Sequence, residues 1–139
     1  MRAIDLHNNI NPRVAIAPGA AITTNTPILS AIIDRAGYES LEFVIETGAL
    51  AAGATYAVSL SDGNTPTLAD GAPTTNTIGT LTQAGFSSAN ANACLKIGYS
   101  GINRFVQMAI TPTGNTSAFI SAIAVLGGAH VAPTPNPPV

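Results

Sequence analysis

The sequence predicts an all-β protein, an antiparallel β-sandwich or jelly roll of about eight short strands. Three observations support this fold class. Short runs of β-branched and apolar residues recur along the chain, and several alternate between apolar and polar positions. The segments between them have turn chemistry, as in Ser61-Asp62-Gly63-Asn64 and Thr113-Gly114-Asn115. No segment has a sustained helical period.

Four runs give the strongest strand signal and supply the predicted core. Residues 40–47 and 55–61 place large apolar side chains at every second position, as a strand with one buried face does. In the run 103–111, the aliphatic positions are expected to face inward. The run 119–126 is apolar on both faces apart from Ser121, which is typical of a central or covered strand. The predicted core consists of Leu41, Phe43, Ile45, Tyr56, Val58, Leu60, Val106, Met108, Ile110, Ile123 and Val125.

The remaining elements are predicted from weaker runs. Further strands are expected at residues 14–16, 28–33, 77–82 and 93–99. A short helix is expected over residues 87–93.

The chain has 139 residues, which is the size of one domain. The β-sandwich is expected over residues 14–129, between an extended N-terminal arm, 1–13, and a Pro-rich C-terminal tail, 130–139. The tail contains four prolines, so it favours polyproline II and cannot join a central strand. The two ends are either frayed termini or arms that become ordered only against a partner.

The charge pattern argues against two classes of partner. Charged residues make up 9% of the chain, against roughly 25% in an ordinary soluble domain. The five basic residues are scattered, so no basic stripe for nucleic acid is present. No apolar run approaches the roughly 18 residues that cross a bilayer, and the first residues contain no apolar signal segment. The sequence therefore predicts neither nucleic acid nor a membrane as partner.

No constellation of catalytic residues is evident, so the protein is expected not to be an enzyme and to hold no cofactor or metal. His7 and His130 lie in the terminal segments, where acid–base catalysis lacks a fixed geometry. Cys94 has no basic cluster beside it and is expected to be a small buried hydrophobe. Glu42 and Glu46 are roughly 13 Å apart along one strand, beyond the spacing of glycosidase carboxylates.

Two glycine-containing turns have an alternative interpretation. Asp62-Gly63-Asn64 and Asp70-Gly71 offer oxygen ligands for calcium, but their spacing is not that of an EF-hand and such pairs are ordinary turn residues. A weak calcium site at 62–71 therefore stays open. The turn Gly98-Tyr99-Ser100-Gly101 lacks the Lys-Ser/Thr pair and the helix of a phosphate loop.

A near-neutral surface with many strands suits a protein whose faces are contact faces, because strand edges must be paired or otherwise protected. Together with the doubly apolar run 119–126, it leads us to expect at least a dimer in solution. The alternative is that the protein's own loops cover this run.

Four stretches, Asp5–Ile10, Ile32–Phe43, Gly98–Val106 and Ser121–Gly127, resemble the capsid cement, or decoration, proteins of tailed-phage and prophage head modules. The resemblance covers most of the chain, but its motifs are structural rather than catalytic. Residues 65–92 have no counterpart in it.

The resemblance implies a jelly-roll protein that is made in the host cytoplasm and binds the exterior of the phage head. Family members bridge neighbouring major capsid protein subunits, often as homodimers. The two terminal segments would then be the arms that contact the shell. The candidate contact residues are Asp5, Leu6, His7, Asn8, Asn9 and Ile10 in the first segment and His130, Val131, Pro133 and Pro135 in the second.

The alternative hypothesis is a carbohydrate- or receptor-binding jelly-roll module of a phage fibre, tail or baseplate. Such a module needs exposed aromatic residues that stack on sugars. The chain has no Trp, three Tyr and four Phe, and most of these seven occupy predicted strand positions.

Overall fold

Two antiparallel β-sheets form a sandwich-like arrangement, which confirms the predicted all-β class. The computed structural model describes residues 5–79 and 85–135. Its elements are β1 (Ile10–Ile16), β2 (Ile28–Leu29), β3 (Ile33–Asp34), β4 (Tyr38–Leu50), β5 (Thr55–Gly63), β6 (Ala72–Thr74), β7 (Thr77–Ile78), β8 (Phe86–Ser87), the short 3-10 helix η1 (Ser88–Asn90), β9 (Cys94–Tyr99), β10 (Phe105–Thr113) and β11 (Ala118–Ala129).

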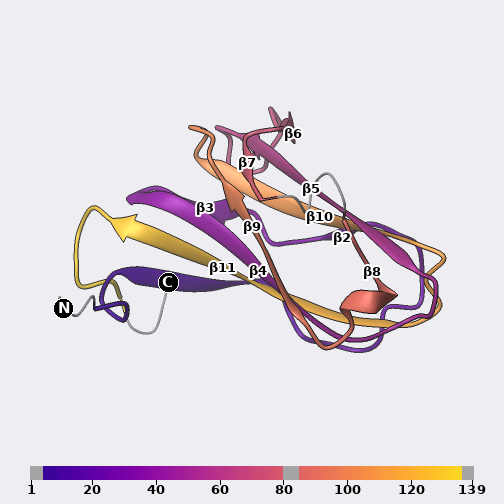
Figure 1. Cartoon of the computed structure of the whole chain (residues 1–139). Coiled ribbons are helices and arrows are strands. Elements are labelled where there is room, and N and C mark those ends of the chain that lie inside the picture. Colours follow the sequence, from indigo (N-terminus) through magenta and orange to yellow (C-terminus); the bar gives the residue numbers. More distant parts are fainter. Residues whose placement is uncertain (1–4, 80–84, 136–139) are drawn as a thin grey trace.

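The two sheets differ in composition and in how their strands connect. Sheet I has the strand order β1–β11–β4–β9–β7. Sheet II has the order β2–β10–β5–β6, with β3 also pairing with β10 and β8 with β5. In Figure 1, β5 and β10 lie above β4 and β11. Most neighbouring strands in the sheets are far apart in sequence, so long-range pairing holds the fold together.

The alternating runs in β4, β5 and β10 form the interior as predicted. β5 pairs with β10 so that Val58 lies opposite Ile110 and Leu60 opposite Met108. Residues opposite each other in an antiparallel pair project from the same face, so these four side chains turn inward together. All nine predicted core residues of the three strands are at most 3% exposed: Leu41, Phe43, Ile45, Tyr56, Val58, Leu60, Val106, Met108 and Ile110.

The predicted inward face of β11 is wrong. Ile123 is 43% exposed, and Val125 is only partly buried. Because β11 is apolar on both faces, its alternation cannot tell which face is inside. The pairing with β4 decides it, since Ala124 lies opposite Phe43 and faces inward. The buried positions of this strand are Ala118, Ile120, Ala122, Ala124 and Leu126.

Several weaker elements are shorter than expected. The run 28–33 divides into β2 and β3, and between them the buried Ser30 donates its N–H to the Met108 carbonyl and accepts the Met108 N–H on its hydroxyl. The run 77–82 contains only β7, and residues 80–82 lie outside the described residues. The helix expected over 87–93 is the single turn η1.

The predicted boundary between the N-terminal arm and the β domain falls inside β1. Residues 10–13 pair with β11, with Ile10 opposite Gly127, and Asn11 is buried. Pro12 occupies this strand because β1 is at the edge of sheet I, where a missing N–H is tolerated.

Candidate interaction surfaces

The described residues contain no group of three or more His, Cys, Asp or Glu side chains that would hold a metal ion. Cys94 is exposed, not buried as predicted. It begins β9 and lies opposite Glu46 of β4, and both residues project from the outer face of sheet I. Across residues 5–79 and 85–135, no helix is long and apolar enough to cross a membrane.

The Asp62 and Asp70 carboxylates of the segment 62–71 accept hydrogen bonds from different groups. The Asp70 carboxylate accepts hydrogen bonds from the backbone N–H groups of Asn64 at 2.8 Å and Thr65 at 3.0 Å and from the Thr65 hydroxyl. These donors, with the Thr65 hydroxyl contributing most, lower the pKa of Asp70 to about 2. Asp62 is buried and accepts a hydrogen bond from the Tyr99 hydroxyl. The two groups do not form a common oxygen cage for calcium.

The two terminal segments pack against each other at one end of the molecule, beside the start of β1 and the end of β11 (Figure 1). Thr134 is buried there, and its N–H donates to the Asn8 carbonyl at 3.0 Å. Its hydroxyl donates to the Ile10 carbonyl at 2.7 Å. The described parts of the predicted arms are therefore ordered by one another.

Some of the predicted contact residues form hydrogen bonds within the terminal segments, and others are exposed to solvent. The Asp5 carboxylate accepts hydrogen bonds from Asn8, mainly from its side chain, and these lower the Asp5 pKa. Asn9 donates its N–H to the Leu6 carbonyl, and the His7 carbonyl faces the Thr134 hydroxyl. On the other segment, His130 donates its N–H to Gly37, and Val131 is 80% exposed. A shallow hollow is lined by Ala36, Gly37, Tyr38, His130, Val131, Pro133 and Pro135.

The outer face of sheet I carries large apolar side chains. Val14, Ile123 and Val44 lie side by side on β1, β11 and β4, and Val14 is 60% exposed. A groove of about 380 Å³ runs beside them, with Glu46 and Cys94 in its lining. Lys96 lies opposite Val44 on the next strand, so acidic and basic groups both border the apolar row.

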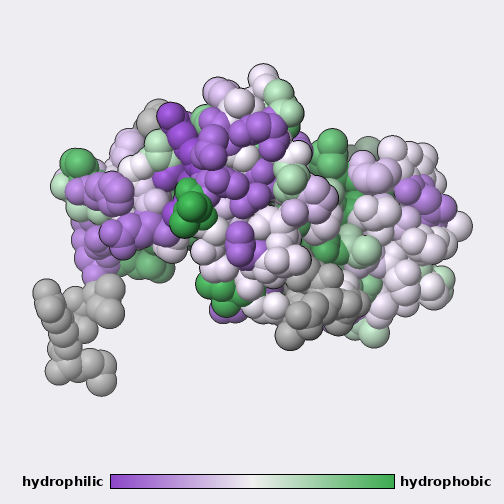
Figure 2. All heavy atoms as spheres, turned by 90° about the horizontal axis from the view of Figure 1, so that it is seen from above, coloured by the Kyte–Doolittle hydropathy of each residue, from purple (hydrophilic) through white to green (hydrophobic). Residues whose placement is uncertain are grey.

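Glu42 lies on the same outer face, opposite Val125 and Gly98. Partial burial raises the pKa of its carboxyl, and the nearby Lys96 ammonium opposes this effect. By contrast, β5 and β10 present small or polar residues on the outer face of sheet II, among them Ala57, Ser59 and Gln107. From above, hydrophilic and weakly polar residues cover much of the molecule, and hydrophobic groups form separate spots (Figure 2).

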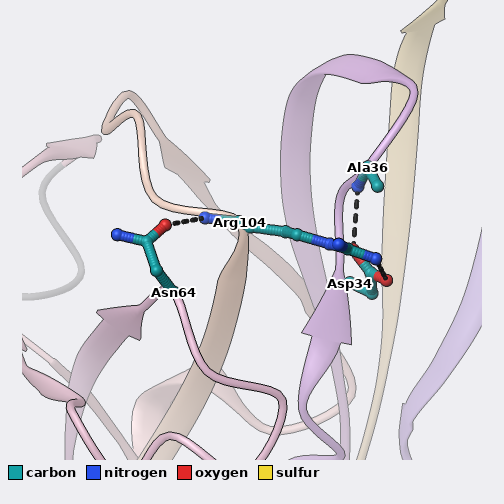
Figure 3. A network of polar contacts seen from close by, with 4 residues as sticks. All are labelled: Asp34, Ala36, Asn64 and Arg104. Carbon is teal, nitrogen blue, oxygen red and sulfur yellow. Dashed lines mark hydrogen bonds and ion pairs between the residues drawn. The ribbon is translucent and has the colours of Figure 1, made fainter.

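The loop 100–104 between β9 and β10 is held by polar contacts on both sides. The Arg104 guanidinium forms a bidentate ion pair with Asp34, at 2.8 and 2.7 Å (Figure 3). This pair lowers the pKa of Asp34, whose carboxylate also accepts the Ala36 N–H. The Arg104 N–H donates to the Asn64 side chain at 3.3 Å. The loop is thus tied both to β3 and to the segment after β5.

The segment 130–135 and the loop 100–104 belong to one continuous surface. A hollow beside the loop is lined by Arg35, Ala36, Tyr38, Ile102, Asn103 and Arg104. Ala36 and Tyr38 also line the hollow beside the segment 130–135. We call this region, made of the turn 34–38, the loop 100–104 and the segment 130–135, the end surface.

The alternation of the run 40–47 placed Val44 on the outward face, but Val14 and Ile102 were not predicted to lie at the surface. For Ile102 a signal was present, because a large apolar residue stands inside the turn sequence Gly101-Ile102-Asn103. For the outer face of sheet I, the signal in the sequence was that the run 119–126 is apolar on both faces. The prediction placed the face with Ile123 and Val125 inside the sandwich, whereas it is the outer face.

No protein-family model and no curated protein sequence matches the chain. Among solved structures, it is similar to a chain described as "Cyanophage Pam1 capsid asymmetric unit", with 16% sequence identity and a TM-score of 0.44, over 91% of each chain. At these values the likeness says nothing about function.

Proposed function

We propose that this protein is a structural component of a phage virion that binds the outside of an icosahedral head and bridges neighbouring major capsid protein subunits. The sequence stretches that resemble cement proteins, such as the jelly-roll cement protein of a short-tailed Bordetella phage, support this proposal. Two of the four stretches, Ile32–Phe43 and Gly98–Val106, contribute to the end surface, and a third, Asp5–Ile10, packs against Thr134 of the segment 130–135.

The observation that carries the proposal is the presence of two separate uncovered surfaces. A bridging protein needs more than one shell contact, and two chains that pair through the outer face of sheet I would present two end surfaces to the shell. The outer face of sheet I is an apolar row with few charges, and apolar area of this kind marks interaction sites. The end surface lies around the turn that precedes β4.

The aromatic residues argue against the alternative of a sugar-binding module. Sugar stacking needs exposed rings. Phe43, Tyr56, Phe86, Tyr99 and Phe105 are all buried, and Tyr56 stacks on Phe86 with ring centroids 4.8 Å apart. Most aromatic rings of this protein therefore belong to the hydrophobic core between the two sheets.

Shell binding is the direct test. Expanded shells of the phage that encodes this chain, prepared without it, are mixed with the purified protein and sedimented. We expect co-sedimentation at a fixed ratio and rupture of the shells at a higher temperature, because a ligand specific for the assembled shell stabilises it by mass action. Binding should weaken little between low and moderate salt, since so few charges are available for screening. A protein that stays in the supernatant at high micromolar concentration contradicts the proposal.

We further propose that the protein is a homodimer through the outer face of sheet I. In a two-fold contact the same patch meets itself, and this patch contains an apolar row with both Lys96 and Glu46 at its borders. Static light scattering should give twice the mass of the chain. Ile123→Glu should give a monomer, whereas Ser59→Glu on the outer face of sheet II should leave the dimer intact. A monomeric wild type at high micromolar concentration contradicts the dimer.

A further inference from the structure

Ile102 stands almost entirely in solvent. Its side chain is 97% exposed, more than any other large apolar residue among the described residues. Single exposed apolar residues are common, so exposure alone decides nothing. The distinguishing feature of Ile102 is the loop that carries it.

Hydrogen bonds fix the loop on both sides of Ile102. The Ser100 N–H donates to the Asn76 carbonyl at 2.9 Å, and the Arg35 guanidinium donates to the Gly101 carbonyl. After Ile102, the Asn103 N–H donates to the Tyr99 hydroxyl at 3.1 Å.

The side chain of Asn103 is held as well, because it accepts a hydrogen bond from the Asn64 amide at 3.0 Å. Position 101 must be glycine, since a Cβ there would lie 2.3 Å from the Tyr99 hydroxyl oxygen. A rigid loop that presents a bulky apolar side chain loses little conformational entropy on binding, which is the property of an interface anchor.

Two arginines, Arg35 and Arg104, lie beside the loop that carries Ile102. The Arg104 charge is balanced by Asp34. Arg35 donates instead to the carbonyls of Gly101 and Glu39, and its guanidinium lies 5.3 Å from the centroid of the Tyr99 ring. Within the described residues, no carboxylate lies within ion-pair distance of Arg35. A partner that meets this loop therefore gains by placing a carboxylate beside Arg35.

We propose that Ile102 is the anchor of the end surface and that it inserts into an apolar pocket of the major capsid protein, with a carboxylate on the rim of that pocket facing Arg35. The inference rests on the proposed function and names the residue that makes the shell contact. It also changes the expected role of the terminal segments, which then lie at the margin of the contact and not at its centre.

The test compares Ile102→Ser with Leu29→Ser in shell co-sedimentation. Leu29 is also an exposed large aliphatic residue, at 60%, but it lies on β2 in sheet II, away from the end surface. Removing the buried part of an isoleucine should weaken shell binding about ten- to hundredfold, whereas Leu29→Ser should bind like the wild type. Both variants should keep the unfolding temperature of the wild type.

The charge of the pocket rim is tested with Ile102→Glu and Ile102→Lys. Both lose the apolar anchor, but the glutamate also meets the rim carboxylate, so Ile102→Glu should bind more weakly than Ile102→Lys. Equal binding of the two variants, or the opposite order, overturns the acidic rim.

The remaining outcomes are also decisive. If the wild type binds shells and Ile102→Ser binds equally well, the anchor is wrong and the proposed function stands. If Ile102→Ser changes the mass measured by light scattering, the partner of Ile102 is a second copy of this chain, and the inference is overturned. If the wild type itself does not bind shells, the proposed function and the inference fail together.

Discussion

Val58→Asp is expected to abolish cooperative folding. Val58 is 3% exposed and lies opposite Ile110 in the middle of the interior. An unpaired carboxylate there costs several kcal/mol or stays protonated, which is also unfavourable. A domain of this size has a total stability of only about 5–15 kcal/mol. Far-UV circular dichroism during a urea titration should show no cooperative transition.

The control for Val58→Asp is Ser59→Asp on the same strand. Ser59 faces outward from sheet II, so the same charge there stays in water and the variant should unfold like the wild type. Loss of folding in both variants would mean that β5 tolerates no charge at all, which contradicts the alternation on which the fold rests.

Tyr99→Phe is expected to lower the free energy of unfolding by about 3 kcal/mol, because it leaves the Asp62 carboxylate buried without the hydroxyl that donates to it. This hydrogen bond joins β9 of sheet I to β5 of sheet II, so it ties the two layers together. The measurement is the urea midpoint at neutral pH.

Tyr56→Phe is the matched control. The Tyr56 hydroxyl donates to the neutral Asn115 side chain at 3.0 Å. Hydrogen bonds to charged groups are roughly twice as strong as neutral ones, so the loss here should be about 1.5 kcal/mol. Equal losses in the two variants would mean that Asp62 gains nothing particular from Tyr99.

Alkaline pH gives a second readout for the Tyr99 contact. Burial, with the hydrogen bond to Asp62, raises the pKa of Tyr99 from 10.0 to about 12. A group whose pKa is higher in the folded state stabilises that state fully below its unfolded pKa and loses the effect as the pH rises toward the folded value. Stability should therefore fall between about pH 10 and 12 in the wild type, and less steeply in Tyr99→Phe.

The sequence predicted the strands whose two faces differ and failed where the faces are alike. In β4 and β5 polar residues alternate with large apolar ones, so the inward face follows from the chain alone. In β11 the choice lay between a face of mainly Ala and a face with Ile123 and Val125. Volume decides it, because Phe43 and Ile45 of β4 fill the interior and leave room for alanine opposite them.

The candidate surfaces were predictable only in part. The two terminal segments were identified by their composition, but their mutual packing depends on Thr134, which meets the Asn8 and Ile10 carbonyls only after β1 and β11 have paired. Ile102 was hidden for the same kind of reason. Its exposure follows from contacts of its neighbours with Asn64, Asn76 and Arg35, all distant in sequence.

The resistance of this protein to a pulling force should depend on where the force is applied. It should be low where the force separates β1 from β11 and high where the force enters through β4. The hydrogen bonds of an antiparallel pair run perpendicular to the strands. A pull applied through residues 5–9 and 130–135 acts at the end where Ile10 meets Gly127, and it opens these bonds one after another. A pull that enters at the turn 34–38 passes directly into β4, whose 13 residues are held between β11 and β9, and must shear both neighbours at once. In the proposed role, contacts at that turn would hold a shell under internal pressure most firmly.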